Sequence, residues 1–297
     1  MRRRTDLAPW HEMRLLALAL FAVFFLPLSV RSEILNEIPF QYRDGLIWMT
    51  VKVTGAGKPL NFLLDSGAGI TTVDLQTVSG LGLELANRQI VQGVNGQAFA
   101  YHVKHFRAVS GRVTLPKSVL AVDLGIVSSR CHRPVDGILG ADFFRGRIVQ
   151  IDFSAGRLRL LNNCELNPAN CEILPIKICN DAFCVPVRVA DRPARWTRLD
   201  TGCDTAPEWV ADETERKRID QTSIGLSDRS IRYIDTCVQI GRERFTPVKV
   251  RVHKEQIFPG EAGLLGNAFL SKFRVTIDEP RSRVILERGS LSRNRES

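Results

Sequence analysis

The chain has 297 residues, of which 44% are hydrophobic and 25% are charged, as in globular proteins of one large domain or two small ones. Its formal net charge is +9, but the sequence contains no run of five or more like charges and no nucleic-acid-binding motif. We therefore expect a solvated basic surface and no nucleic-acid partner.

Residues 1–32 have the pattern of an export signal. Basic residues at 2–4 and at Arg14 precede an apolar run at 15–28. This run is shorter than the about 20 residues of a membrane-spanning helix, so we expect a signal peptide that is cleaved next to Ser32 and a periplasmic or secreted protein. The alternative is an uncleaved segment that anchors the protein to the inner membrane. No other membrane contact is expected.

After this segment the sequence predicts short strands that are joined by turns containing Gly, Asn or Pro. A short helix is expected at 74–78, closed by Gly80, and a helical turn at 141–144. Residues 89–101 are typical of a β-hairpin with a glycine-containing tip. Further strands are predicted at 46–53, 61–64, 105–109, 113–115, 118–122, 136–140, 148–153 and 158–161. The residues Phe143, Phe144 and Phe269 are predicted to lie in the core.

A polar, turn-forming linker at 162–173 divides the chain, and the order of the elements then repeats. Residues 263–270 correspond to 137–144, and residues 274–278 correspond to 148–152. We therefore predict an all-β fold of two homologous, pseudo-two-fold-related lobes, each a closed, barrel-like sheet with short helices. The predicted lobes cover residues 33–161 and 174–287, and 288–297 is predicted to be a disordered tail.

Each lobe carries an aspartate at the end of an apolar strand, followed by a hydroxyl residue and a glycine. The two triplets are Asp65-Ser66-Gly67 and Asp200-Thr201-Gly202. A single triplet is explained by an aspartate that satisfies its own turn. Two copies in matched surroundings favour one shared site, because a buried carboxylate is costly without hydrogen-bond partners and a two-fold relation brings the loops face to face.

Two adjacent carboxyl groups share one proton near neutrality, because both cannot easily ionise. One group can then act as a general base on a water molecule while the other protonates a carbonyl oxygen. The pattern therefore predicts acid–base hydrolysis that needs no metal, no cofactor and no covalent intermediate.

The paired triplets, each followed later by an apolar-apolar-Gly element at 138–140 or 264–266, resemble the aspartic peptidases. Two lobes in one chain are similar to the bacterial retropepsin-like group fused in tandem, and the resemblance extends over 38–286. It implies a monomeric enzyme with a catalytic pair, Asp65 and Asp200, and a polypeptide substrate. It also implies supporting roles for Ser66, Gly67, Thr201 and Gly202, and a substrate-binding flap at Gly93, Val94, Asn95 and Gly96, with a second flap at 224–233.

Two features depart from the family pattern. Retroviral proteases usually have an arginine after the glycine of the second element, where this chain has Ala141 and Asn267, so the bracing of the lobes is in doubt. Cys203 stands at the position that Ala68 occupies in the first lobe, and Asp204, which follows it, is expected to be solvated.

The sequence thus predicts an exported aspartic endopeptidase. The alternatives are a catalytically inactive peptide-binding protein of the cell envelope and a purely structural envelope protein.

Seven cysteines fit an oxidising compartment. Disulfide bonds are predicted for the pairs Cys164–Cys171 and Cys179–Cys184, and the odd count leaves at least one thiol unpaired or intermolecular. The sequence has no Cys-x-x-Cys motif with a histidine nearby, so no metal site is expected. A nucleophilic role for Cys203 would need a positioned histidine, and Ser66 lacks the Gly-x-Ser-x-Gly context of a serine hydrolase.

Overall fold

The computed structural model describes residues 32–93, 96–164, 170–205, 207–211 and 232–288. The predicted export signal before Ser32, the flap residues Val94 and Asn95, most of the second flap and the tail beyond Arg288 lie outside the described residues. No helix in these described ranges is both long and apolar enough to cross a membrane.

The fold is almost entirely β, as predicted. The elements of the first half are β1 (Ile34–Arg43), β2 (Leu46–Val53), β3 (Leu60–Leu64), β4 (Thr72–Asp74), α2 (Leu75–Gly80), β5 (Leu85–Gly93), β6 (Gly96–Val103), β7 (Ala108–Ser110), β8 (Val113–Thr114), β9 (Leu120–Val122), α3 (Gly125–Arg130), β10 (Gly137–Leu139), the 3-10 helix η2 (Ala141–Phe143), β11 (Ile148–Asp152) and β12 (Arg157–Leu161).

The second half repeats this order. Its elements are β13 (Cys171–Pro175), β14 (Lys177–Cys179), β15 (Ala182–Val189), β16 (Arg195–Leu199), β17 (Glu208–Val210), β18 (Arg232–Ile240), β19 (Glu243–His253), β20 (Gly263–Leu265), α5 (Asn267–Leu270), β21 (Phe273–Asp278), the 3-10 helix η3 (Glu279–Arg281) and β22 (Arg283–Arg288).

Strand β2 shows how the alternation of side chains builds the first lobe. Successive residues of a strand point to opposite faces of the sheet. Ile47 and Met49 therefore pack into the main core, whereas Leu46 and Trp48 join a second cluster on the other face, together with Leu63 of β3. Because both faces are covered, this part of the strand is apolar throughout.

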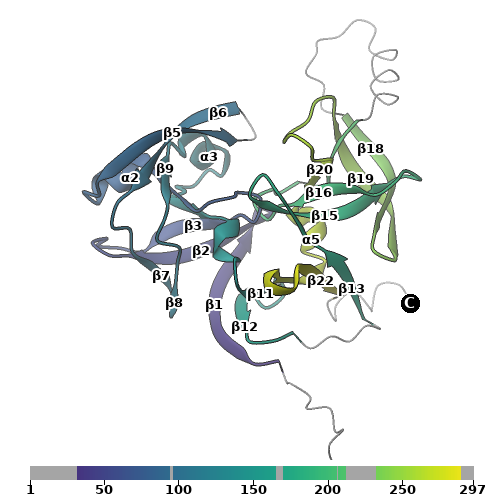
Figure 1. Ribbon diagram of the computed structural model, residues 1–297, viewed down its shortest axis with the longest axis horizontal. Coiled ribbons are helices and arrows are strands. Elements are labelled where there is room, and N and C mark those ends of the chain that lie inside the picture. The colour runs from purple at the N-terminus through teal and green to yellow at the C-terminus, as the bar shows by residue number, and fades with distance from the viewer. Residues whose placement is uncertain (1–31, 94–95, 165–169, 206, 212–231, 289–297) are drawn as a thin grey trace, which may run out of the picture.

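A sheet shared by the two lobes joins the halves of the molecule. At its centre β11 pairs antiparallel with β21, with Val149 opposite Ile277 and Ile151 opposite Val275. On one side the sheet continues through β12 to β1, and on the other through β22 to β13. The order outward from the centre is the same on both sides, as a pseudo-two-fold axis between β11 and β21 requires (Figure 1).

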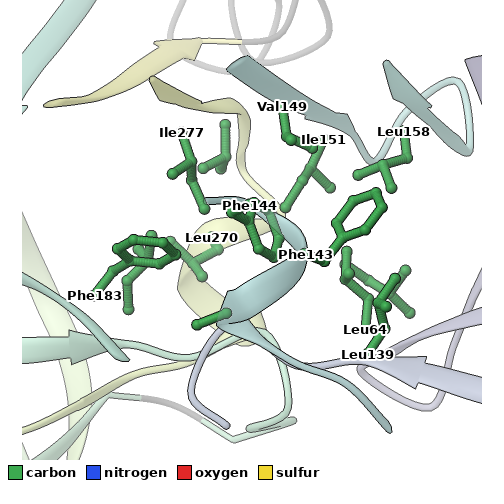
Figure 2. Packing of buried hydrophobic residues seen from close by; sticks show 14 of the residues in the cluster. Leu64, Leu139, Phe143, Phe144, Val149, Ile151, Leu158, Phe183, Leu270 and Ile277 are labelled. Atoms are coloured by element: carbon green, nitrogen blue, oxygen red, sulfur yellow. The ribbon is translucent and has the colours of Figure 1, made fainter. Parts of the chain in front are cut away.

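The main core packs against this shared sheet. Figure 2 shows Phe144 between the sheet residues and Phe183 of the other lobe, and Phe143 on the opposite side, near Leu158 and Leu64. The rings of Phe144 and Phe183 meet edge to face, with 5.9 Å between their centroids. As predicted, Phe143 and Phe144 have no exposed surface, and Phe269 has almost none. Burying each such ring contributes about 1.5–3 kcal/mol, so this packing holds the two lobes together behind the aspartate loops.

In each lobe a second strand runs parallel to the strand that ends at the aspartate. β10 pairs with β3, and β20 pairs with β16. The backbone N–H of Asp65 donates to the carbonyl of Leu139 at 2.9 Å, and that of Asp200 donates to the carbonyl of Leu265 at 3.1 Å. The apolar-apolar-Gly elements therefore lie behind the two aspartates, as the sequence predicted.

The two predicted disulfide bonds are not found in the structure. Cys179 and Cys184 lie on the paired strands β14 and β15, with their thiol groups in hydrogen-bond contact. Cys164 and Cys171 belong to one buried cluster beside Ile285. Sequence spacing correctly indicated which cysteines lie near each other, but it does not determine the geometry that a bond requires. The segment interpreted as a linker, 162–173, includes the start of β13.

Candidate active site

Asp65 and Asp200 lie side by side where β3 and β16 end. Their carboxyl groups form a hydrogen bond with each other. Oδ1 of Asp65 accepts the backbone N–H groups of Gly67 at 2.8 Å and Ala68 at 3.0 Å, and Oδ1 of Asp200 accepts that of Gly202 at 2.9 Å. The structure thus brings together the two aspartates that the sequence singled out, one from each lobe.

Gly67 and Gly202 allow this close approach. A Cβ on Gly67 would lie less than 3.0 Å from the carboxyl group of Asp200, and a Cβ on Gly202 would overlap the carboxyl group of Asp65 in the same way. Each carboxyl group therefore rests on the backbone of the opposite lobe's loop. Only glycine, which has no Cβ, fits at these two positions.

The hydroxyl groups of Ser66 and Thr201 tie the two loops together beneath the carboxyl pair. The N–H of Ser66 donates to Oγ1 of Thr201 at 2.9 Å, and the N–H of Thr201 donates to Oγ of Ser66 at 3.2 Å. Each hydroxyl then donates across the interface, Ser66 to the carbonyl of Leu199 at 2.7 Å and Thr201 to that of Leu64 at 3.0 Å. Both hydroxyl groups are buried, so every bond in this network joins one lobe to the other.

Burial raises the pKa of both carboxyl groups. For Asp200 the charge of Asp65 adds to burial, and its pKa lies well above the usual range. For Asp65 the hydrogen bonds from the loop, first among them that of Gly67, oppose the effect of burial on the pKa. The pair therefore favours a state with one shared proton, carried on the Asp200 side.

Comparisons with known proteins agree with this geometry. Residues 49–143 match the family model described as aspartyl protease. The structure is similar to the crystal structure of an aspartic proteinase from Irpex lacteus, with a TM-score of 0.54 and 14% sequence identity, covering 90% of this chain and 100% of that chain. Together, the family match of residues 49–143 and the fold support an aspartic peptidase of the pepsin/retropepsin-like kind. A search of curated proteins gives no match. At such low identity the structural likeness concerns the fold.

Asn267 braces the two lobes of this aspartic peptidase fold. Its Nδ2 donates to the carbonyl of Gly45 in the first lobe at 2.8 Å and to that of Thr201 in the second at 2.7 Å. Its backbone N–H donates to the carbonyl of Cys203 at 2.8 Å. The counterpart in the first lobe, Ala141, can make only the backbone bond. The position where retroviral proteases have arginine therefore still joins the lobes in this chain, through the side-chain amide of Asn267.

Two hairpin turns support the active-site loops of the peptidase fold in a pseudo-symmetric way. The turn of the β1–β2 hairpin places Gly45 directly against Asp204, and the turn of the β14–β15 hairpin places Asp181 directly against Gly69. Asp204 follows Gly202 by two residues, and Gly69 follows Gly67 by two residues. Asp204 is exposed, as the sequence predicted.

Next to the carboxyl pair, Cys203 is held as a neutral thiol. Its Sγ lies 3.1 Å from Oγ1 of Thr205, and burial, followed by the charge of Asp200, raises the pKa of the thiol to about 12. His253, at the end of β19, bonds to Oε2 of Glu208 at 2.7 Å. Nucleophilic cysteine chemistry needs a thiolate, which this environment disfavours. The described part of the chain holds no cluster of His, Cys, Asp or Glu side chains that could bind a metal ion.

The predicted flap is a long hairpin of the first lobe, formed by β5 and β6, with Gly93 opposite Gly96 at its described end. The side chains of Val91 and Ala100 pack in one small apolar cluster with Ile70. Ile70 lies at the end of the first active-site loop. The hairpin is therefore attached, near its middle, to the loop that carries the first aspartate.

Sequence reasoning missed a buried ion pair beside this site. Arg198 in β16 and Glu261 before β20 are each only 2% exposed, and the guanidinium group binds both carboxylate oxygens. Nη1 of Arg198 also donates to the carbonyl of Gly67 in the other lobe, at 2.5 Å. The available signal was an arginine two residues before Asp200, at the position where the first lobe has Leu63.

Proposed function

We propose that the protein is an exported aspartic endopeptidase, in which Asp65 and Asp200 activate a water molecule to hydrolyse peptide bonds. The observation that carries the proposal is the contact between two buried carboxyl groups, each also held by backbone N–H groups. An aspartate that only satisfied its own turn would gain nothing from a second carboxyl group against it, because the two repel when ionised. The family match of 49–143 and the fold support the same conclusion.

In the proposed reaction the ionised Asp65 removes a proton from a water molecule held between the carboxyl groups, and the water oxygen attacks the peptide carbonyl carbon. Asp200 gives its proton to the carbonyl oxygen, which yields a neutral diol. The diol collapses when Asp65 passes its new proton to the leaving nitrogen and a diol hydroxyl returns a proton to Asp200. The two products are a carboxylic acid and an amine, and both aspartates regain their starting states.

The proposed substrate is an extended polypeptide that lies between the lobes, with the hairpin that carries Gly93 and Gly96 as a flap over it. No cofactor takes part in this scheme, and a monomer is sufficient because one chain supplies both aspartates. Export rests on the sequence of residues 1–32. An N-terminus near Glu33 in protein isolated from its cell supports cleavage, whereas an intact Met1 in the membrane fraction supports the anchor.

The test is to incubate the chain that begins at Glu33 with a diverse peptide mixture from about pH 3 to 7, the range that a carboxyl pair should span. Cleavage is followed by mass spectrometry. Asp65→Asn should abolish cleavage, whereas the matched control Asp191→Asn changes an exposed carboxyl group outside the active-site loops and should leave it intact. If the wild type binds peptides but cuts none, the protein is the inactive peptide-binding alternative. If it neither binds nor cuts, a structural role is favoured.

A further inference from the structure

We propose that Arg198 is a positioning residue that makes the carboxyl pair asymmetric, so that Asp65 is kept as the ionised base and the shared proton stays on Asp200. This inference rests on the proposed peptidase function and adds to it a residue outside the two Asp-hydroxyl-Gly triplets. It follows from three observations: the face of β16 that carries the arginine, the peptide group that it contacts, and the lack of an equivalent donor in the first lobe.

Arg198 lies two residues before Asp200, so both side chains point to the same face of the sheet. The residue two positions before Asp65 is Leu63, which packs with Trp48 in an apolar cluster. The two lobes match in their aspartates, hydroxyl residues and glycines, but not at this position. A guanidinium group in the second lobe therefore takes the place of a hydrocarbon side chain in the first, and the pseudo-two-fold symmetry of the site is broken.

The guanidinium group reaches Asp65 through one peptide group. Nη1 of Arg198 donates to the carbonyl oxygen of Gly67, and the N–H of the same peptide group, on Ala68, donates to Oδ1 of Asp65 at 3.0 Å. A cation on the oxygen of a peptide group polarises it and strengthens the bond that its N–H donates. This chain of hydrogen bonds favours the ionised form of Asp65.

The other carboxyl group lacks this support. Oδ1 of Asp200 accepts the N–H of Gly202. The N–H of Cys203 is directed to the main-chain carbonyl of Asp200, at 3.4 Å, whereas that of Ala68 is shared between the main-chain carbonyl of Asp65, at 3.2 Å, and its Oδ1. Leu63, at the position equivalent to Arg198, has no group that could donate to this loop. The local hydrogen bonds therefore stabilise a charge on Asp65 more than on Asp200. In addition, the positive charge of Arg198 lowers the pKa of both carboxyl groups.

The ion pair is held rigidly in place. Glu261 binds two nitrogens of the guanidinium group and also accepts Nδ2 of Asn180 at 2.8 Å. The ring of Phe258 lies under the guanidinium, 3.6 Å from its carbon to the ring centroid. A buried ion pair is often no more stabilising than apolar side chains of similar size. Its stability alone therefore does not account for a charge at this place.

A test must distinguish the effect of Arg198 on the two carboxyl groups from the effects of other titratable groups near the ion pair. The Cys203 thiol lies beside Asp200, and the Cys184 thiol of β15 lies near both Arg198 and Glu261. Both thiols have a raised pKa and stay neutral in the acidic range, so Arg198 and Glu261 are the charges that act on the carboxyl pair there. Removing the cation and removing its counter-charge should then have opposite effects.

The experiment follows the Asp65 and Asp200 carboxyl carbons by ¹³C NMR as a function of pH, together with the acid limb of kcat/KM. The double variant R198M/E261M removes both charges without leaving one of them buried alone. Its lower apparent pKa and its acid limb should move up by about one pH unit. E261Q keeps the cation and removes its partner, and both readouts should move down. R198K keeps the charge and should titrate close to the wild type.

If the ion pair were only structural, the apparent pKa would shift in the same direction in R198M/E261M and in E261Q, or it would stay unchanged in both. Either result would overturn the proposal. A shift of R198K as large as that of R198M/E261M would also contradict it. As a control, D278N/R283M removes an ion pair of the shared sheet whose carboxylate is buried and whose guanidinium group is partly exposed, and it should not alter the titration. The NMR titration needs no turnover, so it tests this inference even if the wild type cuts no peptide and the proposed function fails.

Discussion

Gly67 of the first lobe lies directly against the carboxyl group of Asp200 in the second lobe, so closely that no side chain fits between them. We predict that Gly67→Ala loses all cleavage and lowers the free energy of unfolding by roughly 1–3 kcal/mol, because the added Cβ must push the two loops apart. Chemical denaturation and the peptide assay measure both effects. The exposed Gly57 has open space around its Cα, so Gly57→Ala is the matched control and should leave both values unchanged.

Thr201→Ala should destabilise the protein by about 1–3 kcal/mol, because it leaves the buried N–H of Ser66 and the carbonyl of Leu64 without their partner. Thr201→Ser keeps the hydroxyl group and should remain near the wild type. Since Ser66 and Thr201 belong to one network, the double alanine variant should lose less than the sum of the two single losses. Additive losses in urea denaturation would show that the two hydroxyl groups act independently.

The stability of the protein should depend on Asp200 in a specific pH window. Its pKa in the folded state lies well above the usual range of an aspartate, so the folded protein binds the proton more tightly than the unfolded chain. The stability that this tighter proton binding contributes is fully present below the pKa of Asp200 in the unfolded chain. It is lost as the pH rises through the pKa of Asp200 in the folded protein. Asp200→Asn, which is neutral at every pH, should therefore raise Tm relative to the wild type at neutral pH.

The gain from Asp200→Asn should shrink towards acid, where the wild-type carboxyl group is itself protonated. Comparing the two proteins at each pH removes the contributions of other carboxylates, such as Glu208, whose pKa is lowered chiefly through its hydrogen bond with His253. A variant that is less stable than the wild type at neutral pH, or a difference that does not vary with pH, would contradict the burial of a proton-sharing pair.

Asn267→Asp should destabilise the protein by several kcal/mol, on the order of the cost of an unpaired buried charge. The new carboxylate would face the carbonyl oxygens of Gly45 and Thr201, which now accept hydrogen bonds from the amide. Its neighbour Ala268 is exposed, so Ala268→Asp adds the same charge without burial and should change Tm little. Similar melting temperatures for the two variants would remove the bracing role that we assign to Asn267.

The sequence allowed the lobes, the strand order and the aspartate pair to be predicted because the same elements occur twice. Each Asp-hydroxyl-Gly triplet is weak alone, but the second copy and the glycine-ended strand behind each aspartate imply one interface between matching loops. The helix α3 was not predicted, since it is only six residues long, has no side-chain cap and buries none of its residues.

The contacts of Arg198, Glu261 and Asn267 could not be predicted, because each joins residues that are far apart in the chain. An arginine at a position where the other lobe has leucine indicates a buried partner, but the sequence does not determine which acid or which carbonyl it contacts. Likewise, cysteine spacing placed Cys179 near Cys184 without determining a bond. The pairing of strands can be inferred from repeated patterns, whereas the pairing of individual polar side chains depends on the final packing.

The most direct test of the account is cleavage of one identified peptide substrate by the wild type, Asp65→Asn and Asp200→Asn, measured by mass spectrometry at the pH of highest activity. The account predicts that the wild type cuts the peptide at a defined bond and that neither asparagine variant cuts it, because the reaction needs one ionised and one protonated carboxyl group. Cleavage of the same bond by either variant would contradict a shared catalytic pair.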